Sequence, residues 1–192
     1  MPTLIGMSTV MKLRNFVLAV AACALTVPAL GEHPSSPYAG QQTRAIKALS
    51  PEDIAGLLNG EGIGMAKAAE LNGYPGPVQV LDLVGELGLT ADQRQQIQAI
   101  FDRMSAAAKP LGAELVEREQ LLDQAFAKGE ITPDRLAAET AAIGELAGRL
   151  RWVHLAAHLE TRALLNPGQI ALYQHLRGYG DPAGAMHHHH HG

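Results

Sequence analysis

Cysteine and aromatic side chains are scarce in this chain, and their scarcity excludes two ways of stabilising a small protein. Cys23 is the single cysteine among 192 residues, and aromatic residues make up 4% of the sequence. Cys23 lies in a leader-like segment, so disulfide bonds and thiolate chemistry are excluded if that segment is removed. Leucine, alanine, isoleucine and methionine must therefore supply most of the packing in any core.

The sequence also lacks the short motifs that mark common enzyme sites. It has no phosphate-binding glycine loop, no nucleophile elbow, and no serine, histidine and acid set at a recognisable spacing. Basic character is lacking as well, because residues 32–192 carry 13 basic against 19 acidic side chains, a net charge of −6. We therefore expect neither an enzyme nor a protein that binds nucleic acid or anionic lipid.

The first thirty-one residues are typical of an export signal. Two basic residues precede an almost wholly apolar stretch over 16–25, and small residues then provide a cleavage site after Gly31. The apolar stretch is too short to span a membrane. Translation could equally start at Met11, because the residues before it add nothing to the signal. A loose match to a lipoprotein signal at Cys23 makes lipidation the less favoured alternative.

The rest of the chain predicts an all-α protein, because no segment alternates apolar and polar residues with period two. A stretch rich in Pro, Ser and Gly over 32–49 is expected to be a flexible arm, and 179–192 a flexible histidine-rich tail. Residues 50–178 between them predict one helical domain. Caps, first-position prolines and apolar periodicity place its helices at 51–60, 64–71, 77–87, 91–127, 133–165 and 167–177. The loop between the two long helices is short, so these should be antiparallel neighbours.

The second long helix is apolar on two sides. Trp152, Leu155 and Leu159 fall nearly opposite the stripe formed by Leu146, Leu150 and Val153. The antiparallel neighbour can cover only one of these sides. The amino-terminal helices, the last helix, a second subunit or a client protein would have to cover the other. Glu139 falls near the apolar stripe of the same helix, either as a buried partner for an arginine or as a boundary residue.

A pair of histidines provides the sharpest chemical signal. His154 and His158 are four residues apart on a helix, so both side chains project from one side of it. Their imidazoles can approach one metal ion, or can form a hydrogen-bonded pair that lines a crevice.

A run of five histidines near the end of the sequence is the second possible metal-binding feature. Its members, which we call the histidine tract, are His187, His188, His189, His190 and His191. The tract has two interpretations, a native metal-binding tail or a purification tag. As a native tail, it could bind nickel, copper or zinc through neutral imidazoles without a preformed geometry.

A five-residue motif occurs twice, each time where a helix should begin. Leu89, Thr90 and Gln93 form the first copy, and Leu165, Asn166 and Gln169 form the second. Thr90 and Asn166 are good N-cap residues, so the motif predicts a structural joint. With the export signal and the absence of strands, the first copy resembles the LTxxQ motif of the periplasmic Spy/CpxP-like family, which includes the CnrX-type and ZraP-type heavy-metal sensors.

This resemblance implies a hooked antiparallel helical hairpin with four main helices that dimerises into a curved cradle. It also implies that His154 and His158 match a histidine and a methionine that bind metal in the CnrX-type sensors. Those sensors take further histidines from an early helix, but no histidine occurs here between His33 and His154. A third ligand would have to come from elsewhere, and the candidates in the amino-terminal helices are Met65, Glu70 and Glu86.

We therefore expect a metal-responsive, ATP-independent, chaperone-like envelope-stress protein of the periplasm. A periplasmic heavy-metal sensor or signalling adaptor without chaperone activity is the alternative. The implied cofactor is a divalent transition metal, Ni, Co, Cu or Zn. The implied partners are a second copy of the chain in a homodimer, and either unfolded envelope proteins or a membrane-bound signalling protein.

Overall fold

The computed structural model describes residues 36–179 and is helical throughout that range. It contains a 3-10 helix (Gln41–Thr43) and six α-helices, with no strand among the described residues. The α-helices are α1 (Pro51–Asn59), α2 (Lys67–Glu70), α3 (Pro77–Asp82), α4 (Ala91–Ala127), α5 (Pro133–Leu164) and α6 (Pro167–Leu176). The all-α prediction is confirmed.

Two predicted features lie outside the described residues. The first is the export signal over 1–31, which includes Cys23. The second is the histidine tract, made of His187, His188, His189, His190 and His191. Metal binding by these five side chains therefore stays a prediction.

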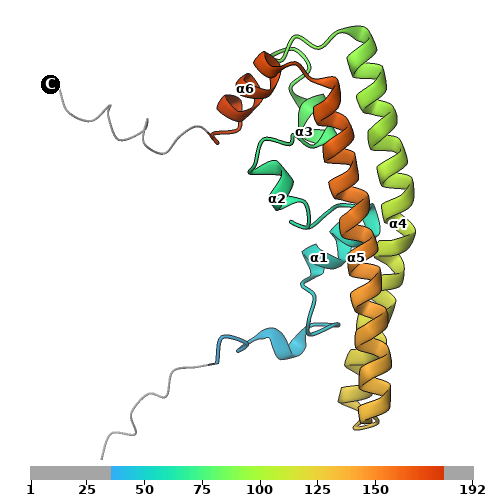
Figure 1. Ribbon diagram of the computed structural model, residues 1–192. Coiled ribbons are helices and arrows are strands. Elements are labelled where there is room, and N and C mark those ends of the chain that lie inside the picture. The colour runs from blue at the N-terminus through green and yellow to red at the C-terminus, as the bar shows by residue number, and fades with distance from the viewer. Residues whose placement is uncertain (1–35, 180–192) are drawn as a thin grey trace, which may run out of the picture. The chain divides into compact units, whose positions relative to one another are not determined.

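The two long helices form an antiparallel hairpin, as Figure 1 shows. α4 runs without interruption through Pro110, and Gly129 turns the chain back with a φ of 67°. Thr132 then caps α5, its hydroxyl accepting a hydrogen bond from the Arg135 amide N–H at 3.2 Å. The predicted boundaries of both long helices agree with the structure to within one residue.

The short helices lie on one side of this hairpin (Figure 1). α1 packs on α4, α2 on α5, and α3 on both long helices, while α6 turns back from the end of α5. The contact of α1 with α4 is unusually close. A β-carbon on Gly112 of α4 would lie 2.1 Å from the backbone oxygen of Leu57, so only glycine permits this approach.

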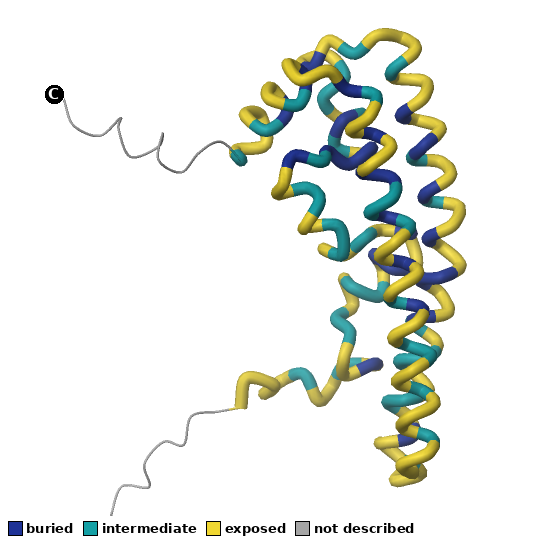
Figure 2. Tube along the Cα trace, viewed as in Figure 1, coloured by how far each residue is buried: buried dark blue, intermediate teal, exposed yellow. Residues whose placement is uncertain are grey.

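Three apolar clusters along the hairpin make up the buried core (Figure 2). The first is built from Leu57, Ala108, Leu111, Leu115, Leu146 and Leu150. The second joins α3, α4 and α6 through Val80, Leu87, Ile97, Leu165 and Tyr173, and the third consists of Ile100, Met104 and Ala157. Between Leu115 and Leu146, toward the hairpin loop, Ala125 is the one buried hydrophobic residue of the two helices. The loop end of the hairpin therefore has little buried core.

Two of the short helices are shorter than the sequence predicts. α2 begins at Lys67 rather than at residue 64, because Ile63 and Gly64 adopt positive φ angles that a helix cannot contain. α3 ends at Asp82 rather than at residue 87, and the chain continues in turns to Gly88, which has a φ of 56°. Because the chain leaves the helix there, the Leu87 side chain packs into the second cluster, where it is 4% exposed.

The packed part of the chain begins before residue 50. Ile46 is 4% exposed, and Lys47 forms an ion pair with Asp123 of α4 at 3.2 Å. The Lys47 backbone N–H also donates to the Asp123 carboxylate at 3.1 Å. Residues 46–49 thus belong to the helical body, because Leu49 packs against the first apolar cluster and Lys47 pairs with α4.

Candidate functional site

The first copy of the repeated motif forms a capping box at the start of α4. The Thr90 hydroxyl accepts a hydrogen bond from the Gln93 N–H at 3.1 Å, and the Gln93 Oε1 accepts one from the Thr90 N–H at 3.0 Å. Leu89 packs against the second apolar cluster. These bonds satisfy amides that the first helical turn would otherwise leave unpaired.

The second copy forms the same box at the start of α6. The Asn166 Oδ1 accepts from the Gln169 N–H at 2.9 Å, and the Gln169 Oε1 accepts from the Asn166 N–H at 3.0 Å. Leu165 is 7% exposed and belongs to the same cluster as Leu89. The leucines of both motif copies therefore pack in the second apolar cluster.

The two motif glutamines also bond to each other. The Gln93 Nε2 donates to the Gln169 Oε1 at 3.0 Å, and the Gln169 Nε2 donates to the Gln93 Oε1 at 3.1 Å. Each Nε2 also donates its second hydrogen to a backbone oxygen. That of Gln93 donates to Leu164 at 2.7 Å, and that of Gln169 donates to Leu87 at 3.3 Å. We call this pair the glutamine clasp. It joins the starts of α4 and α6, two points 76 residues apart in sequence.

His154 and His158 project from α5 toward the segment that carries α2 and the start of α3. Both are buried, 4% and 7% exposed, and both line a cavity of ≈ 740 Å³ bounded by that segment, α4 and α5. Burial, with a smaller effect of the neighbouring His158, lowers the pKa of His154, so this imidazole is neutral at pH 7. Its Nε2 atom is buried and has no hydrogen-bond partner.

The second histidine is held by the backbone opposite. The Nδ1 atom of His158 lies 2.6 Å from the backbone oxygen of Tyr74 and donates its hydrogen there. That bond leaves Nε2 as the ring nitrogen with a free lone pair. A β-carbon on Gly76 would lie 3.0 Å from this Nε2, and one on Gly62 would lie 3.2 Å from the His154 ring. The lack of a β-carbon at these two glycines therefore lets the backbone pack closely against the two rings.

Glu70 of α2 lies beside His158 and is bound by several neighbours. Its carboxylate accepts hydrogen bonds from the hydroxyls of Tyr173 and Tyr179, and from the Gly76 N–H at 3.3 Å. Arg177 approaches it at 3.6 Å. Burial and the hydrogen bond to Glu70 raise the pKa of the Tyr173 hydroxyl, which therefore stays a donor. Glu70 thus ties α2 to α6.

Of the three candidates for a further metal ligand, Glu70 is the one that contacts the histidine pair in the described residues. One of its oxygens lies 3.8 Å from the His158 Nδ1, the atom that already bonds to the backbone. Met65 packs against the first apolar cluster, and Glu86 is exposed. Within residues 36–179, no three His, Cys, Asp or Glu side chains are grouped so that they could hold a metal ion.

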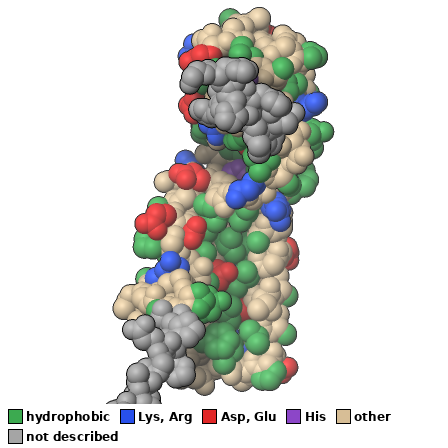
Figure 3. All heavy atoms as spheres, turned by 90° about the vertical axis from the view of Figure 1, so that its left-hand side faces the viewer, with side chains coloured by type: hydrophobic (Ala, Val, Ile, Leu, Met, Phe, Trp, Pro, Cys, Tyr) green, Lys and Arg blue, Asp and Glu red, His purple; other side chains and the backbone are tan. Residues whose placement is uncertain are grey.

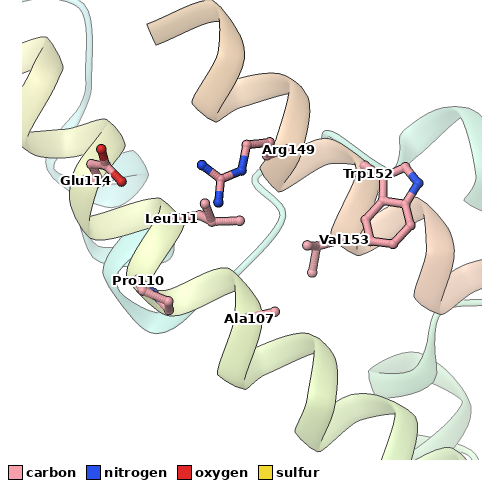
Figure 4. Close-up of a pocket in the computed structure, with 7 residues that line it drawn as sticks. All are labelled: Ala107, Pro110, Leu111, Glu114, Arg149, Trp152 and Val153. Carbon is pink, nitrogen blue, oxygen red and sulfur yellow. The ribbon is translucent and has the colours of Figure 1, made fainter. Parts of the chain in front are cut away.

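The second apolar side of α5 is not covered by the described chain. Trp152 is 70% exposed and Leu159 is 59% exposed, while Leu155 is half-buried. Trp152 stands at the edge of a hollow of ≈ 450 Å³ between the long helices, with Pro110 and Leu111 of α4 across from it (Figure 4). We call Trp152, Leu155 and Leu159 the uncovered face.

Apolar side chains are also exposed near the hairpin loop. Figure 3 shows hydrophobic side chains gathered over the lower half of the face turned to the viewer, with acidic groups among them. Leu122 and the 55% exposed Phe126 line a hollow of ≈ 490 Å³ there, in which burial raises the pKa of the Glu119 carboxyl. Nearby, Glu139 is mostly buried and faces Arg118 at 3.6 Å.

A family model places this arrangement among known proteins. The model of the LTXXQ motif family protein matches residues 79–177, the stretch from α3 to the end of α6. The chain belongs to the LTXXQ motif family. No curated protein and no solved structure matches it.

Membership of the LTXXQ motif family supports a role of the periplasmic Spy/CpxP-like kind. Proteins of this family are typically periplasmic and act as chaperone-like or sensor proteins without enzymatic activity. No helix among residues 36–179 is both long and apolar enough to cross a membrane. The match covers both copies of the motif, so the glutamine clasp lies inside the family region.

Sequence reasoning missed three features of the site. It found both capping boxes but not the bonds between their glutamines, because those depend on how α6 returns to α4. It missed Gly62 and Gly76, which stand opposite the histidine rings from a different part of the chain. It also missed the Tyr74 carbonyl that holds His158. Only the glycine-rich composition of 60–76 gave any signal for these contacts.

Proposed function

We propose that this protein is a periplasmic, ATP-independent, chaperone-like protein that binds unfolded envelope proteins on apolar surface exposed along its hairpin. The observation that carries the proposal is the uncovered face, where Trp152 and Leu159 are 70% and 59% exposed. Large side chains of this kind, side by side on one helix, are typical of a surface that binds another protein.

The surroundings of the uncovered face suit weak and varied clients. Trp152 borders a shallow hollow whose floor is apolar, and Arg149 and Glu114 line the hollow at its other end (Figure 4). The second apolar region around Phe126 lies toward the hairpin loop. The two regions share no lining residue, so they offer a client two separate apolar contacts, which need no fixed partner geometry.

Suppression of client aggregation without nucleotide tests this proposal. A molar excess of the protein should slow aggregation of a reduced, unfolding model client, measured by light scattering. Trp152→Gln with Leu159→Gln should weaken suppression several-fold, whereas Leu172→Gln with Leu176→Gln, two less exposed leucines on α6, should not. Equal client aggregation with and without the wild-type protein would contradict the proposal and favour the sensor or adaptor alternative.

A second function, response to a transition metal, rests on the histidine pair. His154 has a buried, neutral imidazole whose Nε2 has no partner, and His158 has one nitrogen fixed by a backbone carbonyl. Metal-binding histidines commonly have this arrangement, with one ring nitrogen anchored and the other free. The residues therefore fit two ligands of a divalent metal such as Ni, Co, Cu or Zn.

A metal bound by this pair would act on the contact between α5 and the short helices. Only α5 carries the two histidines, while Tyr74 and Gly76 lie just before α3. A ligand that draws the two imidazoles together changes how His158 meets Tyr74. Metal binding would then bias the position of this segment, and such a change could be read by a membrane-bound signalling partner.

Calorimetric titration of the full exported chain, with the histidine tract replaced by serine, tests the metal function. We expect about one divalent site, which is lost in His154→Ala with His158→Ala and weakened in Gly76→Ala, where the new methyl group faces the His158 Nε2. His175→Ala should bind like the parent, since that side chain is exposed. Circular dichroism checks that each variant is folded. A parent that binds none of the four metals at neutral pH would contradict this function.

A further inference from the structure

The cavity in front of the histidine pair is much larger than a metal ion requires. Its volume is ≈ 740 Å³, whereas a water molecule takes up about 30 Å³. A bare ion with a few waters would therefore leave most of the cavity unfilled by any specific contact. The walls are largely apolar, with Phe101 and Met104 from α4 and Val78 from α3. Such a space suits a small organic molecule.

The histidine pair alone is too small a ligand set to hold an ion. A divalent transition metal takes four to six ligands in most protein sites. The histidine pair offers two nitrogens, and no third His, Cys, Asp or Glu joins them among the described residues. Glu70 is engaged by two tyrosines, Arg177 and a backbone amide. The remaining ligands must therefore come from other groups, and a molecule bound in the cavity is one source of them.

A free cation stands at the edge of the same cavity. Lys67 lines it, is exposed, and forms no ion pair with any residue in the described range. Arg177 is another cation of the lining, but it is paired with Glu70. Glu61 lies in the lining too and could accept a hydrogen bond from a metal-bound amine. Lys67 and Glu61 together match a molecule with a carboxylate and an amine.

We infer that the cavity binds the metal more tightly as a chelate with a small amino carboxylate, such as a free amino acid, than as a bare ion. His154 and His158 would hold the metal, the chelator would complete its ligand set, and its carboxylate would pair with Lys67. This inference rests on the metal function proposed above. It adds the chemical class of the ligand and a residue that recognises it.

The test compares two nickel chelates that differ by one carboxylate. The full chain with serine in place of the histidine tract is titrated with Ni²⁺ alone, with a 1:1 nickel–histidine complex and with a 1:1 nickel–histamine complex. We expect the histidine complex to bind about tenfold more tightly than the histamine complex, as for one hydrogen bond between charged groups. Lys67→Gln should abolish this preference, and Lys128→Gln, which is exposed at the hairpin loop, should retain it.

The outcomes separate this inference from the metal function. Equal affinity for the two chelates, or tight binding of Ni²⁺ alone with no binding of either chelate, would overturn the inference and leave the metal function standing. A preference for the histidine complex that survives in Lys67→Gln would overturn the role of Lys67. No binding of Ni²⁺ or of either complex would overturn both. Neither lysine is buried, so both variants should fold like the parent.

Discussion

At the residue scale, the glutamine clasp explains why a glutamine ends each motif. A capping box works equally well with glutamate at this position, because only the side-chain oxygen is used. Here each glutamine uses all of its hydrogen-bonding capacity. Its Oε1 accepts from its own cap and from the other glutamine, and its Nε2 donates to the other glutamine and to a backbone oxygen. A carboxylate has no hydrogen for either donation.

Gln93→Glu should therefore destabilise the protein although it keeps the capping box. We expect a loss of about 1–3 kcal/mol in the free energy of unfolding, because Leu164 and Gln169 each lose a donor in a half-buried site. Urea denaturation at pH 7 measures this loss. The control is Gln95→Glu, two residues further along α4 and exposed, which should change stability by less than about 0.5 kcal/mol. Equal stability of the two variants would mean that the clasp contributes nothing.

The burial of His154 makes a separate prediction about pH. Its pKa is lowered from the ordinary value of 6.5, so the unfolded chain binds more protons than the folded one just below that pH. The contribution of His154 to the free energy of unfolding should thus be fully present above about pH 6.5, and it should be lost as the pH drops below that value. His154→Gln should flatten this slope in denaturation curves between pH 7 and 5, and His175→Gln, at an exposed position of α6, should not. Parallel curves for all three proteins would refute the assignment.

At the element scale, local sequence signals determine some helix boundaries, and tertiary contacts determine the others. The starts of α1, α4, α5 and α6 were predictable because each cap is made within four residues. The start of α2 and the end of α3 were not, because the backbone there adapts to the long helices. Leu87 is buried only since the chain leaves the helix at Asp82. The histidine pair was visible as a spacing, but its cavity depends on elements more than 80 residues away.

The close approach of α1 to α4 at Gly112 gives the sharpest test of packing between elements. Gly112→Ala should destabilise by about 1–3 kcal/mol, because a β-carbon 2.1 Å from the Leu57 oxygen must push α1 off the hairpin. Gly144→Ala, in the exposed middle of α5 with nothing within 4 Å, should instead stabilise by up to about 1 kcal/mol. Thermal and urea unfolding report both changes. Stabilisation by Gly112→Ala would show that α1 does not pack as described.

At the scale of the whole molecule, the uncovered face has two competing uses. A second copy of the chain would bury it permanently, whereas a client would bury it only when bound. A stable interface buries roughly 800 Å² on each partner, more than three side chains provide, so the hollow between the long helices would have to take part. The two uses exclude each other on one face, because a residue at a dimer interface is not free for a client.

We predict that the protein is a homodimer through this face, in an equilibrium that clients can shift. Leu159→Glu should convert it to monomer in sedimentation velocity at micromolar concentration, because the dimer would bury an unpaired charge. Leu136→Glu, 23 residues earlier on α5 and thus roughly 35 Å away, is the matched control and should remain dimeric. An unfolded client in excess should also dissociate the wild-type dimer. A dimer that survives both Leu159→Glu and excess client would mean that the chains associate elsewhere, whereas a wild-type monomer would leave the face free for clients alone.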